Sequence, residues 1–246
     1  VPVAVSEDRV AGIRRLLAEV PALTAVVLDD AYQHRRVRPA VNILLSEQQR
    51  PFYADAVLPA GRLRESRAGA ARADVVIITK CAPDLSAAAR ASITEAVRRY
   101  ARPGVPVLFS AYDYGPLVPV PGTAAGRRAA ASTAGSAVVL LTGIAQPGPL
   151  LAHLAAAGYR VAHHARFADH PAFRPAELAA LAAQCGPGQV VLTTQKDAAR
   201  LQEPALAASV ADLPVFYIPI TVRFLADGEA RLAALLGSYF PLPAVG

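Results

Sequence analysis

The sequence has no methionine and no tryptophan, and aromatic residues make up only 6% of its 246 positions. Even the first residue is valine, so we expect the chain to be a fragment or to be incomplete at its N-terminus. Cysteine is scarce: Cys81 and Cys185 lie far apart without metal-ligand spacing, which fits a reduced, cytosolic compartment without disulfides. No uninterrupted apolar run reaches about 18 residues, so no segment predicts a transmembrane helix.

Three signature motifs of ligand-binding α/β proteins are also absent. Lysine occurs only at Lys80 and Lys196, and neither follows a glycine, so the Gly-x-x-x-x-Gly-Lys-Ser/Thr phosphate-binding loop is missing. No Gly-x-Gly-x-x-Gly follows an apolar run, which disfavours a dinucleotide-binding oxidoreductase. No Gly-x-Ser-x-Gly is present either, which disfavours an α/β-hydrolase.

Hydropathy and charge further limit the class of protein and the kind of partner. The chain is 54% hydrophobic and 18% charged, a composition that excludes a disordered protein. The net charge of +6 indicates an acidic partner, such as nucleic acid, a phosphorylated substrate or an anionic membrane. Because the arginines are scattered and no base-reading motif is visible, we expect no nucleic-acid partner.

Short apolar runs alternate with helical patterns along the first half of the chain. The runs predicted to be buried strands are residues 25–28, 41–45, 75–79 and 105–110. Helices are predicted at 8–20 and at 86–100, with Ser86 as a candidate N-cap. Such alternation is typical of a mostly parallel sheet with helices on both faces, an α/β fold.

A stretch rich in proline and glycine interrupts this alternation, and we interpret residues 113–135 as an extended linker. Beyond it the pattern predicts strands at 137–141, 159–162 and 190–194, and helices at 148–157 and 175–183. Residues 215–224 are predicted to be extended and to return to the first half, before a helix at 230–236. The expected parts are a core (1–112), the linker, a smaller C-terminal α/β subdomain (136–214), and a return strand with a closing helix (215–246).

One apolar run ends in two aspartates, Asp29 and Asp30. This is the form of a Walker B segment, because an acid after a buried strand lies at the carboxyl edge of the sheet, where ligands collect. A carboxylate at that edge can hold Mg²⁺ against nucleotide phosphates. Gln33 and His34 follow closely, so four polar groups are expected to converge. The alternative is that the acids only cap the next helix or turn.

A second polar segment surrounds Gly61, with Arg62, Arg64 and Glu65 after it. A glycine turn could present the two guanidinium groups to phosphate. The alternative is an exposed basic loop in which Glu65 pairs locally with an arginine, since surface arginines are usually only solvated.

These strings resemble those of the tetraacyldisaccharide 4′-kinase family. Residues 29–35 are similar to the family's Asp-Asp-x-x-Gln-His-Arg, and residues 58–65 to its Leu-Pro-x-Gly-x-Leu-Arg-Glu, which precedes Arg-Ala-Asp and a strand ending in Thr-Lys. Residues 143–147, 167–170 and 193–198 resemble its Gly-Ile-x-x-Pro, Phe-x-Asp-His and Thr-Thr-Glu-Lys-Asp-Ala, with Gln195 in place of the glutamate.

The resemblance implies a kinase that transfers the γ-phosphate of ATP to the 4′-hydroxyl of a lipid A disaccharide precursor, a tetraacyldisaccharide 1-phosphate. It implies a P-loop NTPase-like fold in which residues 1–112 are the remainder of the kinase core, with ATP and Mg²⁺ as cofactors. It also implies a place at the anionic surface of the bacterial inner membrane, on the cytoplasmic face. The phosphate-binding loop and a membrane anchor are expected upstream of Val1, so the fragment itself is expected to be inactive.

Site residues follow from the resemblance position by position. Asp29 and Asp30 are expected to bind the metal and, with His170, to be catalytic. Gln33 and His34 are expected beside the cofactor. The residues expected to bind the substrate are Arg62, Arg64, Glu65 and Lys196.

His170 would pair with an acid upstream of Val1 that deprotonates the sugar hydroxyl, a role that suits an imidazole with a pKa near neutrality. Two alternatives remain open. One is another P-loop phosphotransferase with a different acceptor. The other is a non-catalytic module that docks on an acidic membrane or a protein partner, which would tolerate the loss of Asp29, Asp30 and His170.

Overall fold

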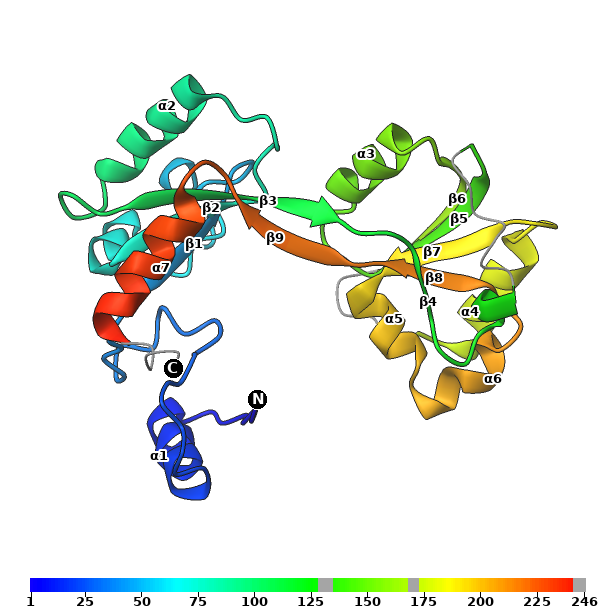
Figure 1. The fold of residues 1–246 in the computed structure, drawn as a ribbon, viewed down its shortest axis with the longest axis horizontal. Helices are drawn as coiled ribbons and strands as arrows, with labels where there is room; N and C mark the ends of the chain where they lie inside the picture. Colours follow the sequence, from blue (N-terminus) through cyan, green and yellow to red (C-terminus); the bar gives the residue numbers. More distant parts are fainter. Residues whose placement is uncertain (128–134, 168–172, 241–246) are drawn as a thin grey trace, which may run out of the picture. The chain divides into compact units, whose positions relative to one another are not determined.

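The computed structural model describes residues 1–127, 135–167 and 173–240. The chain divides into two compact units (Figure 1). Unit 1 comprises Val1–Tyr112 and Val222–Gly246, and unit 2 comprises Asp113–Thr221. The chain therefore passes from one unit to the other twice.

Unit 1 is built on a four-stranded sheet with the strand order β1-β2-β3-β9. The strands are β1 (Ile43–Glu47), β2 (Val75–Thr79), β3 (Val107–Tyr114) and β9 (Ile220–Phe224). The first three are parallel, with Ile43 opposite Val75 and Val76 opposite Val107. The helices are α1 (Arg9–Glu19), α2 (Ala87–Arg98) and α7 (Gly228–Tyr239), with short 3₁₀ turns η1 (Phe52–Ala54) and η2 (Arg67–Arg72).

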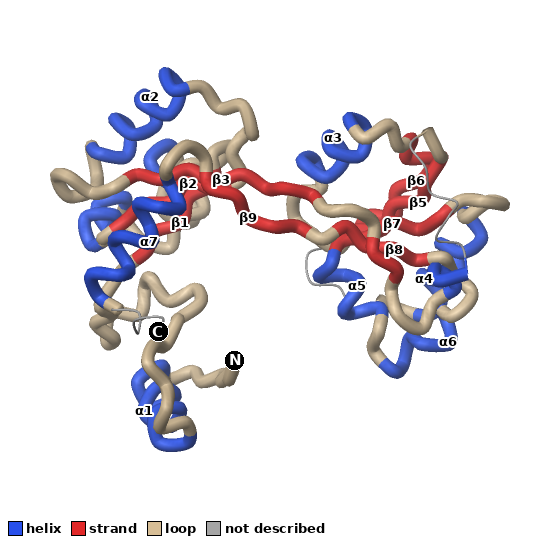
Figure 2. The backbone as a smooth tube through the Cα atoms, in the orientation of Figure 1, coloured by secondary structure: helices blue, strands red, loops and turns tan. Residues whose placement is uncertain are grey.

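Two helices cover the two faces of this sheet (Figure 2). Successive side chains of a strand point to opposite faces, so neighbouring residues of β2 join different clusters. Ile78 lies in one cluster with Val97 of α2, and Ile77 lies in another with Leu232 of α7. The buried run 75–79 is therefore enclosed on both sides, as parallel strands require.

Unit 2 has a five-stranded sheet with the order β4-β8-β7-β5-β6. Its strands are β4 (Val118–Pro119), β5 (Ala137–Thr142), β6 (Arg160–Arg166), β7 (Val190–Thr194) and β8 (Val215–Ile218). All neighbours are parallel except β4, which is antiparallel to β8. The remaining elements are α3 (Gly148–Ala156), α4 (Pro175–Gln184), α5 (Gln195–Leu201) and α6 (Ala207–Val210), with η3 (Ala124–Arg127) and η4 (Pro204–Leu206).

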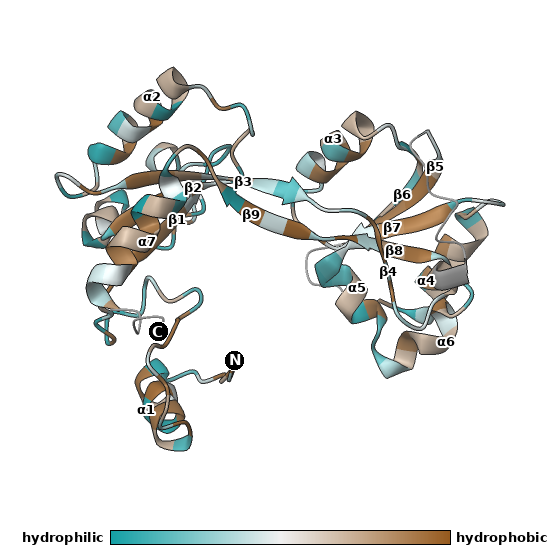
Figure 3. Ribbon diagram, viewed as in Figure 1, coloured by the Kyte–Doolittle hydropathy of each residue, from teal (hydrophilic) through white to brown (hydrophobic). Residues whose placement is uncertain are grey.

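The second sheet is also covered on both faces. Leu140 of β5 packs in a cluster with Leu154 of α3, and its neighbour Leu141 packs with Leu178 of α4. Figure 3 shows β7 and β8 as apolar strands, whereas α2 in unit 1 alternates between apolar and polar residues. The predicted α/β class, with mostly parallel sheets between helices, is confirmed.

Several predicted elements agree closely with the structure because their signals are local. The helix predicted at 8–20 is α1, whose N-cap Asp8 accepts hydrogen bonds from the backbone N–H groups of Val10 (2.9 Å) and Ala11 (3.2 Å). The helix predicted at 86–100 is α2, capped by Ser86 as expected. Strands 75–79 and 190–194 have the predicted bounds.

One strand prediction is wrong, and another is right only in part. Residues 25–28, the expected Walker B strand, pair with no strand in the described part of the chain, and Val27 is 95% exposed. An apolar run becomes a strand only where a neighbour satisfies its backbone N–H and C=O groups. The run at 41–45 does form β1, but β1 is an edge strand on which Leu45 is 61% exposed, so it is not a buried strand.

The extended stretch at 215–224 is divided at Pro219 between the two sheets. Residues before the proline form β8 in unit 2, and those after it form β9 beside β3. Residues 113–135, expected to be a linker, include the end of β3, then β4 and η3. Helices α5 and α6 were not predicted from the sequence, because each is shorter than the window in which helical periodicity can be recognised.

Candidate functional site

The turn around Gly61 is fixed by a carboxylate. Oδ1 of Asp55 accepts hydrogen bonds from the backbone N–H groups of Ala56 (2.7 Å) and Arg62 (3.2 Å). A Cβ atom on residue 61 would lie 2.2 Å from the carbonyl oxygen of Ala56, so only glycine fits. We call residues 55–65 the Arg turn. It presents Arg62 and Arg64 as exposed side chains on a backbone held at both ends.

The two aspartates lie in an irregular segment, residues 29–36, which we call the Asp loop. Asp30 has φ of 48°, in the left-handed region that aspartate tolerates better than most residues. Its Oδ2 accepts a hydrogen bond from Nη1 of Arg64 at 2.9 Å. The side chains are 68% and 62% exposed, and such pairs contribute only about 0–1 kcal/mol. The contact matters because it joins the two segments that the sequence analysis predicts to be functional.

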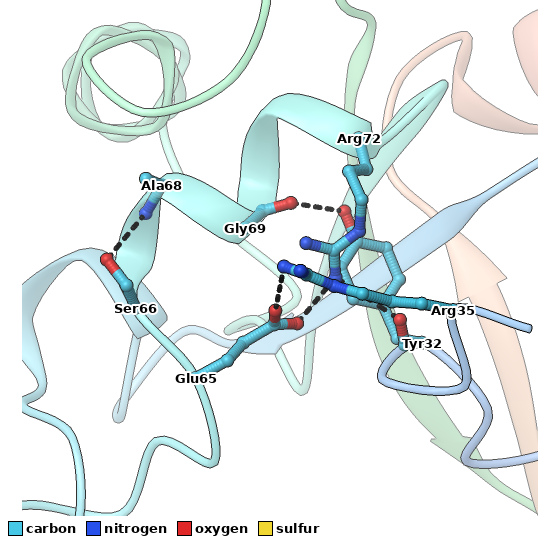
Figure 4. Close-up of polar contacts among 7 residues, drawn as sticks. All are labelled: Tyr32, Arg35, Glu65, Ser66, Ala68, Gly69 and Arg72. Carbon is cyan, nitrogen blue, oxygen red and sulfur yellow. Dashed lines mark hydrogen bonds and ion pairs between the residues drawn. The ribbon is translucent and has the colours of Figure 1, made fainter.

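A second cluster, of half-buried groups with the exposed Arg35 at its side, also connects the Asp loop to the Arg turn (Figure 4). Glu65 accepts a hydrogen bond from Arg72 at 2.6 Å and lies 3.5 Å from Arg35. Arg72 also donates to the backbone carbonyl of Tyr32 at 3.2 Å, and its guanidinium carbon lies 4.7 Å from the centroid of the Tyr32 ring. The hydroxyl of Tyr32 donates to the carbonyl of Gly69 at 3.0 Å.

The environment of this cluster changes the pKa of two groups. Burial raises the pKa of Tyr32 to about 12, although the charge of Arg72 opposes the shift. The hydrogen bond to Glu65 raises the pKa of Arg72, because it stabilises the charged guanidinium. Both groups therefore hold their protons throughout the physiological range.

A small cavity lies where the two segments meet. It is lined by residues of both, among them Tyr32, Gln33, Arg64 and Glu65, and has a volume of about 70 Å³. Ligand pockets usually measure about 300–1,000 Å³. The cavity can therefore hold a few water molecules but not a nucleotide.

The other predicted site residues are placed as follows. Asp29, Gln33 and His34 are exposed on the Asp loop. Lys196 is exposed on α5 in unit 2. His170 lies outside the described residues. Within the described ranges, no three side chains of the His, Cys, Asp and Glu types gather into a metal-binding group. No helix in those ranges has the length and hydrophobicity needed to cross a membrane.

One ion pair at the carboxyl ends of the strands of the unit 1 sheet was not predicted from the sequence. Glu47 ends β1 and Lys80 follows β2, and the Lys80 ammonium contacts the Glu47 carboxylate. Lys80 has φ of 55°. Its position directly after an apolar run was the available signal, since charged residues there lie on the edge where ligands of parallel sheets collect.

A second unpredicted feature lies between β5 and β7 of unit 2. In the sheet, β5 and β7 are neighbours; β6 lies beyond β5, and β8 lies beyond β7. The connection after β5 and the connection after β7 therefore run in opposite directions from the carboxyl ends of the two strands. Open parallel sheets commonly bind ligands at such a point. Here the fully buried Asp197 occupies the gap. Its Oδ2 accepts hydrogen bonds from the Gly143 N–H and from the Thr194 hydroxyl, both at 2.8 Å. Arg200 lies 3.4 Å from the other oxygen.

The chain is therefore an α/β protein in which the charged residues of the Asp loop and the Arg turn come together in unit 1. The family model for tetraacyldisaccharide-1-P 4′-kinase matches residues 1–239. The chain therefore belongs to that family.

Individual relatives agree with this assignment. A tetraacyldisaccharide 4′-kinase from Cytophaga hutchinsonii is 37% identical over 232 residues, covering 94% of this chain and 63% of the relative. One from Bacteroides fragilis is 39% identical over 207 residues, covering 81% of this chain and 54% of the relative. The chain thus spans less than two thirds of the length of these relatives.

A solved structure shares the fold. It is LpxK from Aquifex aeolicus, described as an "apo" form in complex with ATP, with a TM-score of 0.62 and 24% identity. The match covers 96% of this chain and 63% of the Aquifex chain.

Proposed function

We propose that this chain is part of an ATP-dependent kinase that transfers the γ-phosphate of ATP to the 4′-hydroxyl of a tetraacyldisaccharide 1-phosphate in lipid A biosynthesis. Family membership supports the reaction, and the ATP complex of the Aquifex relative supports the nucleotide. The observation that carries the proposal is the 2.9 Å contact between Asp30 and Arg64, which joins the two family-like segments in unit 1. In this proposal residues 1–112 belong to the kinase core.

Asp29 and Asp30 fit a magnesium site. Both carboxylates are exposed on one loop, and Mg²⁺ is commonly held by one or two carboxylates, with water and phosphate oxygens as its other ligands. When bound, Mg²⁺ would neutralise charge on the nucleotide phosphates. Arg64 holds Asp30 in the structure through an exposed, weak pair, so Asp30 can exchange this partner at little cost. Arg64 would then be available to a phosphate oxygen.

The remaining roles are proposed from the family resemblance. Gln33 and His34 would lie beside the cofactor. The residues proposed to contact the substrate are Arg62, Arg64, Glu65 and Lys196. His170 would assist deprotonation of the sugar hydroxyl.

The substrate implies a membrane-surface location. A tetraacylated, phosphorylated disaccharide is both lipid-anchored and anionic, and a chain with net charge +6 is attracted to such a surface. We therefore place the enzyme at the cytoplasmic face of the bacterial inner membrane, without a nucleic-acid partner.

The test uses the full-length protein that contains this chain. Asp30→Asn should lower kinase turnover by at least about 100-fold, the usual effect of removing one electrostatic group from a transition-state site. The matched control is Asp84→Asn, an exposed acid of unit 1 outside the proposed site, which should leave turnover unchanged. Near-normal turnover of Asp30→Asn would show that Asp30 does not bind the metal. A wild-type protein that binds anionic membranes but transfers no phosphate would favour a docking module.

A further inference from the structure

The Asp loop is not held in place by a backbone ladder. Its backbone hydrogen bonds are local, such as His34 N–H to the Ala31 carbonyl at 2.9 Å and Val37 N–H to the His34 carbonyl at 3.2 Å. Residues 25–37 pair with no strand within the described ranges. The position of the loop relative to the Arg turn must therefore come from side-chain contacts, and exposed pairs such as Asp30–Arg64 are too weak to fix it.

Arg72 makes the strongest of these contacts. It follows the Arg turn, at the end of η2, and its guanidinium reaches both segments at once. It donates to the Glu65 carboxylate at 2.6 Å and to the Tyr32 carbonyl at 3.2 Å, and it stacks 4.7 Å from the Tyr32 ring centroid. A charge-assisted hydrogen bond of this kind is about twice as strong as a neutral one. Both hydrogen bonds come from Nη2, and the planar guanidinium lies over the Tyr32 ring at the same time, a stacking contact that the compact ammonium of lysine cannot reproduce.

Tyr32 transmits this restraint to the aspartates. It lies two residues after Asp30, and it packs against the hydrophobic cluster that contains Ile78 of β2 and Val97 of α2. Its hydroxyl is tied to Gly69 at 3.0 Å, so both ends of the side chain are fixed (Figure 4). With Tyr32 fixed, the chain can place Asp30 within 2.9 Å of Arg64.

We propose that Arg72 is a positioning residue that fixes the Asp loop against the Arg turn, so that Asp30 and Arg64 face each other. This inference rests on the proposed function for its catalytic consequence, but not for its structural one. Arg72 is only 30% exposed and is not among the residues that line the cavity between the two segments, so it acts through Tyr32 and Glu65.

Gly69 offers a second way to disturb the same contact. A Cβ atom on residue 69 would lie 2.8 Å from Cδ of Glu65. Because the clash is with the end of a flexible side chain, Gly69→Ala should push the Glu65 carboxylate away from Arg72 and leave the backbone in place. Gly237→Ala is the matched control, since a Cβ there meets nothing within 4 Å.

The experiment measures hydrogen–deuterium exchange of the Asp loop in the full-length protein, together with its melting temperature. Arg72→Lys and Gly69→Ala should each speed exchange across the Asp loop, residues 29–36, by about tenfold, the factor that corresponds to about 1.4 kcal/mol of lost restraint. Gly237→Ala should leave exchange in this segment unchanged, and all three proteins should melt as cooperatively as the wild type. Unchanged exchange in both test variants would overturn the proposal.

Kinase measurements then separate this inference from the proposed function. If the wild type is active, both test variants should lower kcat more than they raise KM for the acceptor, because misplaced aspartates weaken transition-state stabilisation rather than substrate binding. Faster exchange in the two test variants, together with a wild-type protein that has no kinase activity, would refute the proposed function but keep the positioning role. Faster exchange with an unchanged kcat would refute the catalytic part of the role of Arg72.

Discussion

Asp197 provides the sharpest stability prediction, because one buried carboxylate joins two loops of unit 2. Its side chain is fully buried, and Oδ2 accepts hydrogen bonds from the Gly143 N–H and the Thr194 hydroxyl, both at 2.8 Å. In Asp197→Ala both donors lose their acceptor in a site that water does not reach. The ion pair between Asp197 and Arg200, at 3.4 Å, is lost as well.

The magnitude follows from these contacts. Hydrogen bonds to charged groups contribute about 1.5–3 kcal/mol each, so two of them predict a loss of about 3–6 kcal/mol in the free energy of unfolding of unit 2. Asp197→Asn should cost less, about 1–2 kcal/mol, because its amide oxygen can take the place of Oδ2 and accept both bonds without the charge.

Urea unfolding followed by far-ultraviolet circular dichroism is the suitable assay, since the chain has no tryptophan. With an m-value of about 2 kcal/mol/M, Asp197→Ala should lower the midpoint of the unit 2 transition by about 2 M. Glu203→Ala, which removes an exposed acid of the same unit, should leave the midpoint unchanged. A shift for Asp197→Ala no larger than that of this control would refute the view that the carboxylate holds the two loops together.

Three further predictions concern unit 1 and the nucleotide. Gly61→Ala should destabilise unit 1 by about 1–3 kcal/mol or prevent its folding, because its Cβ would lie 2.2 Å from a carbonyl oxygen; thermal melting of wild type and variant tests this. Because burial raises the pKa of Tyr32 from 10.0 to about 12, its contribution to stability should be complete below pH 10.0 and should be lost as the pH rises to 12. An ultraviolet titration of the phenolates should lose its highest step in Tyr32→Phe. An unchanged titration in that variant would contradict the prediction. The 246-residue chain, which has no Gly-Lys-Ser/Thr loop, should show no specific ATP binding by calorimetry, and micromolar binding would mean that the phosphate site has been misplaced.

The elements that the sequence predicts well are those with local causes. Asp8 and Ser86 cap α1 and α2 because a short polar side chain before an amphipathic run can accept the free N–H groups of the first turn. The run at 75–79 is apolar throughout, which is sufficient for a strand buried on both faces. Such signals depend only on residues close by in the chain, so they can be recognised from a single sequence.

The failures share the opposite cause. Residues 25–28 have the same apolar character as 75–79, but strand formation depends on a pairing partner, and none pairs with them in the described part of the chain. The contact of Asp30 with Arg64 spans 34 positions, so no pattern in either segment predicts it. The family resemblance identified both segments, but the structure alone shows that they meet.

Glu65 illustrates how the two kinds of information combine. The sequence left two roles open for it, substrate binding and local pairing with an arginine. The structure places it in contact with Arg72 and Arg35, at 23% exposure. Local pairing with arginine is therefore observed. Substrate binding stays a proposal, and it requires Glu65 to contact the substrate while it also pairs with these arginines.

The edge position of β1 has a practical consequence for handling the chain alone. Among the residues that the structure describes, no strand pairs with one side of β1, and its side chains Ile43 and Leu45 are 37% and 61% exposed. An open edge with aliphatic side chains is a template on which further copies can add as strands. Preparations of the isolated chain should therefore form soluble oligomers or precipitate as concentration rises, and a charged substitution such as Leu45→Lys should delay this.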